Sequence, residues 1–90
     1  MDTETILQMV RDSLGIKSTA RDNRLKAIIN GVITELENEK GIVLDSENPC
    51  HLLFVTDYSM WRFEHPSEPM PRHLQFRYHN LTIHNGQAVI

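Results

Sequence analysis

Apolar residues recur every three or four positions through the first 40 residues, the spacing that places them on one face of a helix. Ile6, Leu7, Val10 and Leu14 predict a first amphipathic helix over residues 3–14. A longer stripe predicts a second helix over residues 20–40. The members of this second stripe are Leu25, Ile28, Ile29, Val32, Ile33 and Leu36. A Gly-Ile pair follows each stripe, at 15–16 and 41–42, and glycine in the left-handed conformation commonly ends a helix.

The polar side of the second predicted helix carries Asp22 near its start and three glutamates near its end. Glu35, Glu37 and Glu39 occupy alternate positions, which point around a helix instead of together, so we expect them on a solvated face. Gly31 interrupts the same helix and costs about 1 kcal/mol relative to alanine. We expect a close approach of another helix, or a slight bend, at this glycine.

The third predicted helix, over residues 49–63, is apolar around most of its circumference. Asn48 and Pro49 form a recognisable start, an asparagine cap followed by proline at the first helical position, with Ser46 as a rival cap. A helix of this kind is either central in its domain or turns part of its surface toward another subunit. Because 90 residues provide little chain to wrap it, an oligomeric interface is expected. Its apolar side chains are Leu52, Leu53, Phe54, Val55, Tyr58, Met60, Trp61 and Phe63.

Three of the four prolines lie within residues 65–71 and predict an exposed loop. Pro71 then opens a short fourth helix over residues 71–80, with Leu74 and Tyr78 on one side and Phe76 nearer the other. Asn85-Gly86 between two short alternating runs is a strong hairpin signal, and a tail that orders on binding is the alternative. The predicted fold is therefore all-α, a small bundle of three to four helices forming a single domain over 1–80, with a C-terminal hairpin or extended tail over 81–90.

Composition narrows the class of protein. With 40% hydrophobic and 23% charged residues, 90 residues suit one globular domain. No apolar run approaches the ~18–20 residues that span a bilayer, so we expect a small intracellular domain without membrane contact. The formal net charge of −3 lies entirely in residues 1–47, and no acidic side chain follows Glu68. The C-terminal third is thus suited to an acidic partner.

Catalytic, cofactor and metal motifs are not found in the sequence, and none of these sites is predicted. The glycines stand alone and form no phosphate-binding loop, and the single cysteine excludes cysteine-rich metal sites. Cys50 beside His51 could make a reactive thiol at a helix start, but an ordinary small residue looks the same. The C-terminal histidines, at 73, 79 and 84, match no strong ligand spacing.

Two further groups of residues bear on function. Asp57, Tyr58 and Arg62 predict a polar cluster with a structural or intersubunit salt bridge. The first two helices and the short turn between them suggest a helix-turn-helix, in which Arg21, Asn23 and Arg24 would face DNA. A small DNA-binding regulator is therefore the alternative function, although the negative net charge argues against it.

Two stretches of the chain carry a resemblance to a known family. Residues 57–63 read Asp-Tyr-x-x-Trp-Arg-Phe, and residues 70–81 read Met-Pro-Arg-His-Leu-Gln-Phe-Arg-Tyr-His-Asn-Leu. With the two preceding Gly-Ile-terminated helices, this arrangement resembles the small head–tail connector (adaptor or head-completion) proteins of long-tailed bacteriophages and prophages of Gram-positive bacteria.

The resemblance implies a structural protein of the virion neck with no enzymatic step, assembled in the host cytoplasm. Such proteins form a ring of about twelve subunits on the portal protein, extend the DNA channel and provide the surface for the stopper or tail-completion protein. Double-stranded DNA would pass through without sequence-specific binding. The protein interfaces implied by the resemblance would involve Tyr58, Trp61, Arg62, Phe63, Arg72, Arg77 and Tyr78.

Overall fold

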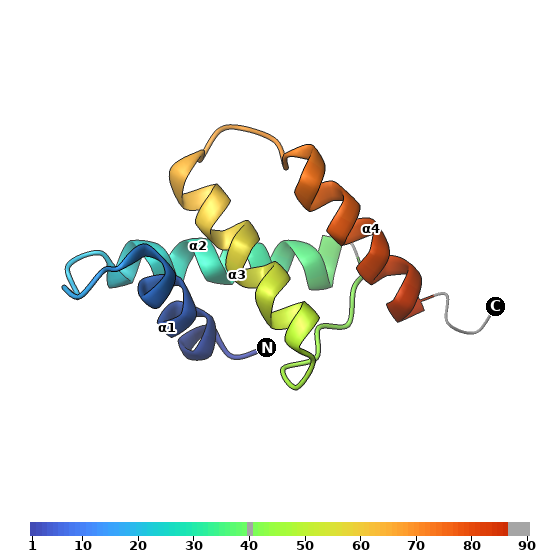
Figure 1. The fold of residues 1–90 in the computed structure, drawn as a ribbon, viewed down its shortest axis with the longest axis horizontal. Helices are drawn as coiled ribbons and strands as arrows, with labels where there is room; N and C mark the ends of the chain where they lie inside the picture. The colour runs from blue at the N-terminus through green and yellow to red at the C-terminus, as the bar shows by residue number, and fades with distance from the viewer. Residues whose placement is uncertain (40, 87–90) are drawn as a thin grey trace.

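The chain forms four α-helices and one π-helical segment in the computed structural model, which describes residues 1–39 and 41–86, the stretch 82–86 by its backbone only. Helices α1 (Thr3–Leu14) and α2 (Asp22–Thr34) come first, and the π-helix η1 (Glu35–Glu39) directly continues α2. Helices α3 (Pro49–Glu64) and α4 (Arg72–Gly86) are joined by the proline loop (Figure 1). No strand occurs in the described ranges, and the predicted all-α bundle is confirmed.

The sequence signals for helix ends are realised in the structure. The Asn48 side chain accepts a hydrogen bond from the Cys50 amide across 2.9 Å, with Pro49 in the first turn of α3. Gly15 and Gly41 have φ angles of 71° and 70°, the left-handed conformation expected of them. Behind Gly15 the Ile16 amide donates to the Arg11 carbonyl across 3.0 Å, which closes α1.

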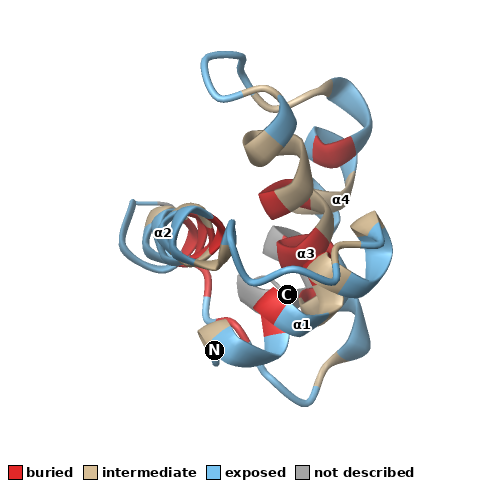
Figure 2. Cartoon of the chain, turned by 90° about the vertical axis from the view of Figure 1, so that its left-hand side faces the viewer, coloured by how far each residue is buried: buried red, intermediate tan, exposed pale blue. Residues whose placement is uncertain are grey.

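Helix α3 is the centre of the fold. It packs against α1 and α2 on one side and against α4 on the other (Figure 1). Its residues Phe54, Val55 and Tyr58 are almost fully buried, and the buried faces of α1 and α2 turn toward it (Figure 2). The chain therefore covers most of the apolar circumference of α3 by itself. Among large apolar side chains of α3, Leu53 stays 50% exposed.

Helix α4 extends farther than the sequence indicated. The hairpin or extended segment predicted over 81–90 is wrong as far as Gly86, because α4 continues through Asn85-Gly86; residues 87–90 lie outside the described part. Leu74 and Leu81, seven residues apart, are both buried and lie on the same face of α4. A lone hairpin is marginally stable in water, whereas this face gains burial against α3.

Gly31 faces solvent and not a neighbouring helix. A Cβ atom added there would meet nothing within 4 Å, so the close helix approach expected from the sequence is wrong. The two glycines that carry positive φ angles are also surrounded by open space, which leaves backbone conformation as the difference between them and Gly31.

This contrast predicts opposite effects of one substitution at two positions. Gly15→Ala should lower the free energy of unfolding by about 1 kcal/mol, because alanine is strained at positive φ. Gly31→Ala should raise it by about 0.5–1 kcal/mol, since alanine favours a helix interior. Urea unfolding followed by circular dichroism measures both. Equal effects of the same sign would contradict the assigned helix ends.

Candidate functional site

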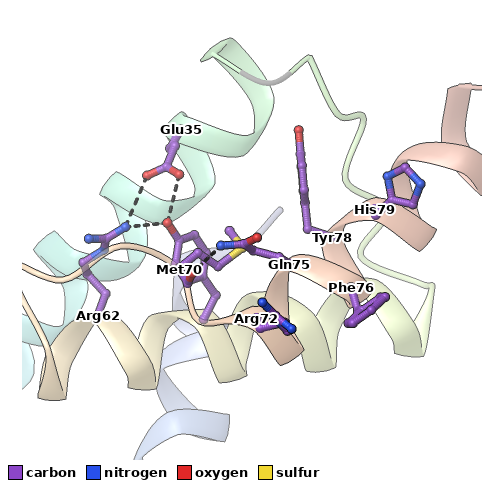
Figure 3. A pocket seen from close by; sticks show the side chains of 9 residues that line it. Glu35, Arg62, Met70, Arg72, Gln75, Phe76, Tyr78 and His79 are labelled. Carbon is purple, nitrogen blue, oxygen red and sulfur yellow. Dashed lines mark hydrogen bonds and ion pairs between the residues drawn. The ribbon is translucent and has the colours of Figure 1, made fainter.

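An open groove of about 720 Å³ lies where η1, α3 and α4 meet. Its walls come from three segments that are far apart in sequence: the start of η1, the second half of α3, and the loop and first turns of α4 (Figure 3). The groove stays open because α4 packs on α3 and not on η1 in the described part of the chain. The lining residues are Glu35, Tyr58, Arg62, Met70, Arg72, Gln75, Phe76, Tyr78 and His79.

A polar network forms one end of the groove. The Tyr58 hydroxyl donates to Glu35 Oε2 across 2.9 Å, and Arg62 Nη2 donates to the Tyr58 oxygen. Arg62 Nη2 also lies 3.8 Å from Glu35 Oε1, and its Nη1 donates to the Glu68 carbonyl across 3.1 Å (Figure 3). The network thus ties η1 to α3 and α3 to the proline loop.

The electrostatics of this network favour a neutral phenol. Burial raises the pKa of Tyr58 above its ordinary value of 10.0, and the adjacent Glu35 carboxylate raises it further. The Arg62 guanidinium acts in the opposite direction, as a weaker influence. The neutral Tyr58 hydroxyl can donate its hydrogen bond to Glu35, which stabilises the network.

Glu35 is the network member that the sequence interpretation missed. It was expected on a solvated face with Glu37 and Glu39, but its side chain is half-buried and paired, while the other two are exposed. The sequence does contain a signal. Glu35 follows Ile28 by seven residues and Val32 by three, the spacing of one helix face, so it continues the apolar stripe toward the core.

Four of the seven predicted interface residues meet at the groove. Tyr58 and Arg62 belong to the polar network, although Tyr58 is only 1% exposed and acts mainly as a core residue. Arg72 and Tyr78 line the α4 side.

The other three predicted residues lie elsewhere. Trp61 is half-buried and stacks on His65 with 3.9 Å between ring centroids. Phe63, also half-buried, lies under the Arg24 guanidinium of α2, 5.6 Å from the ring centroid. These contacts place two aromatic side chains at the C-terminal end of α3, away from the groove lining.

Arg77 makes its contacts within the chain, where it pairs with a residue of α3. Its Nη1 lies 2.5 Å from Asp57 Oδ2, and its guanidinium lies over the Phe54 ring. Of the predicted cluster, Tyr58 and Arg62 contact each other, and Asp57 forms a structural salt bridge with Arg77 of α4. On α3 the five-residue offset to Arg62 is too long for a direct pair, whereas Arg77 faces Asp57 from the neighbouring helix.

Phe76, which the sequence placed on the side of its helix away from Leu74, is a surface residue that was not among the predicted interface residues. Its side chain is 66% exposed, unusual for a phenylalanine, and it lies on the outer side of α4 (Figure 3). Arg72 and His79 stand four residues before it and three after it, so the three share one helix face.

The residues considered for metal or thiol chemistry do not assemble. Within the described part no three His, Cys, Asp or Glu side chains are placed to hold a metal ion. Cys50 is exposed, and the buried His51 accepts a hydrogen bond from the Asp45 amide through Nδ1 across 2.9 Å. His73 and His79 are exposed on α4, and the side chain of His84 lies outside the described residues. None of the described helices is both long enough and apolar enough to cross a bilayer.

Comparisons of this chain with models of protein families, with curated proteins and with solved structures find no match.

The polar network predicts a pH-dependent loss in a tyrosine variant. Tyr58→Phe should lower the free energy of unfolding at pH 7 by about 1–2 kcal/mol, because Glu35 and Arg62 each lose a partner. Above pH 10 the wild-type protein should lose stability, since Tyr58 ionises in the unfolded chain before it does in the folded one. The variant lacks this contribution.

Urea unfolding of both proteins between pH 7 and pH 11 measures the difference. The gap in stability should narrow above pH 10. A gap that stays constant across this range would show that the folded state does not hold the Tyr58 proton.

Proposed function

We propose that this protein is a head–tail connector of a long-tailed phage or prophage, a structural protein of the virion neck. It would assemble as a ring on the portal protein in the host cytoplasm, extend the DNA channel and present the surface on which the stopper or tail-completion protein docks. Its work would be done by protein–protein contacts, without catalysis or a cofactor.

One observation carries the proposal beyond the resemblance itself. The two stretches that resemble connector proteins, residues 57–63 and 70–81, pack against each other as parts of α3 and α4. Together they provide most of the groove and its exposed rim, including Arg72 and Phe76. Within the second stretch Phe76 is 66% exposed, so this stretch supplies apolar surface beside the groove as well as core residues such as Leu74.

The roles of the interface residues follow from their positions. Arg72 and Tyr78 would contact the portal or a neighbouring subunit at the groove. Trp61 and Phe63, half-buried at the end of α3, would anchor contacts within the ring, because aromatic residues dominate interface energy. Arg77 would act indirectly, by holding α4 on α3 through Asp57.

The charge distribution also suits a channel through which DNA slides. Binding to the DNA backbone needs unpaired cations, and several here are neutralised within the chain. Arg11 pairs with Asp22, and Lys26 pairs with Glu4. The net charge of −3 adds a general repulsion of phosphate.

The alternative function, a DNA-binding regulator reading DNA with α2, has less support. In the first half of α2, Lys26 is paired and Arg24 lies over Phe63. Arg21 is the exposed cation at its start without an acidic partner among the described residues. Arg21 therefore provides a test of the alternative.

Capture from a cell lysate tests the two functions with a matched pair of variants. Immobilised wild-type protein should retain a portal or another neck protein from the lysate of a phage-producing bacterium, after nuclease treatment. Arg72→Glu should reduce the retained amount by about tenfold or more, because a carboxylate then replaces the guanidinium that contacts the partner. Mass spectrometry identifies and quantifies the retained proteins.

Arg21→Glu is the control. Both arginines are exposed, stand at the beginning of a helix and have no acidic partner in the described part, so both variants should fold. Arg21→Glu should retain the neck protein like the wild type. Retention of DNA that Arg21→Glu abolishes and Arg72→Glu spares would reject the connector in favour of the regulator.

A further inference from the structure

The outer rim of the groove combines an apolar side chain with cationic and hydrogen-bonding groups. Arg72, Phe76 and His79 stand on one face of α4, and all three are exposed (Figure 3). Deeper in the groove, Met70 and Tyr78 are half-buried and extend the apolar surface. A partner that covers this rim would bury Phe76, which favours binding, and would contact Arg72 one helical turn away.

The charge of the rim is positive although the chain is negative. No acidic residue follows Glu68 in the sequence. Carboxylates of the neighbouring segments are already engaged, Glu35 by Tyr58 and Arg62, and Asp57 by Arg77. Arg72 has no acidic partner among the described residues, and its guanidinium is exposed.

One hydrogen-bond donor of this region is used within the chain, and two others on the rim are not. The Gln75 side chain donates to the Met70 carbonyl across 2.7 Å, which stiffens the loop-to-helix junction. Arg72 and the His79 imidazole remain as donors on the exposed rim. An exposed arginine one helical turn from an exposed aromatic side chain is suited to a carboxylate that stands beside an apolar anchor.

We propose that the groove and its rim bind an acidic segment of a second protein. A carboxylate of that segment would pair with Arg72, a second acceptor would face His79, and an aliphatic or aromatic side chain would cover Phe76. A volume of about 720 Å³ admits a short anchoring segment and not a whole helix face. This inference rests on the proposed docking function and names the chemistry of the partner.

Selection of peptides from a random display library on the immobilised full-length protein tests the proposal directly. The selected peptides should be enriched in Asp and Glu placed beside an apolar residue. A synthetic copy of the strongest binder should lose about tenfold in affinity for Arg72→Glu and for Phe76→Ala, measured by calorimetry. Its affinity for Arg21→Glu should equal that for the wild type.

Three results of the peptide experiment would overturn the proposal. The selected peptides could lack an acidic bias, or bind Arg72→Glu as tightly as the wild type, or fail to emerge at all. Circular dichroism of each variant separates loss of binding from loss of fold. Sedimentation at high protein concentration tests whether a second copy of the chain occupies the groove. Self-association that Arg72→Glu abolishes would assign the groove to that second copy and overturn the proposal.

The outcome is separable from that of the connector function. Acidic peptides that bind at Arg72 and Phe76, with no neck protein retained from the lysate, would uphold the groove and reject the connector. A neck protein retained equally by wild type and Arg72→Glu would uphold docking in general and reject this groove as its site.

Discussion

The fold depends on covering α3, a helix with apolar side chains around most of its circumference. Helices α1 and α2 cover one side of it and α4 covers the other. Because α4 packs on α3 alone among the described helices, its position is set by a small number of contacts. Leu74 and Leu81 bury its inner face, and Arg77 reaches Asp57 across the helix pair.

This arrangement explains why the candidate site lies where it does. An α4 held only from its inner side leaves an outer face with Arg72 and Phe76 exposed. The groove lies between α4 and η1. The polar network of Glu35, Tyr58 and Arg62 holds one end of the groove in place. The stability of the fold and the shape of the groove are thereby linked, since Tyr58 belongs to both the core and the groove lining.

The sequence predicted those features that depend on local pattern. Stripes of apolar residues located the helices, and the Asn48-Pro49 pair and Gly15 located helix ends, because these effects act within a few residues. The failures have a common physical origin in long-range contacts. Burial of Leu81 against α3 favours a helix where Asn85-Gly86 suggested a hairpin.

The candidate site was predictable only in part. Arg72 and Tyr78 were among the interface residues that the resemblance implied, and the structure brings both to the groove. Glu35 was missed because the α-to-π transition at the end of α2 and its partner 23 residues away cannot be read from charge spacing alone. Phe76 was placed on the other side of its helix from Leu74 but not proposed as an interface residue, because its exposure depends on which face of α4 meets α3.

The central claim, that the outer face of α4 is a docking surface, is tested most directly by photo-crosslinking in a phage-producing bacterium. A photoreactive phenylalanine analogue is placed at position 76, on α4, or at position 23, an exposed site on α2. The account predicts a covalent adduct with a neck protein from position 76 and none from position 23. An adduct from position 23 alone, with protein or with DNA, would contradict it.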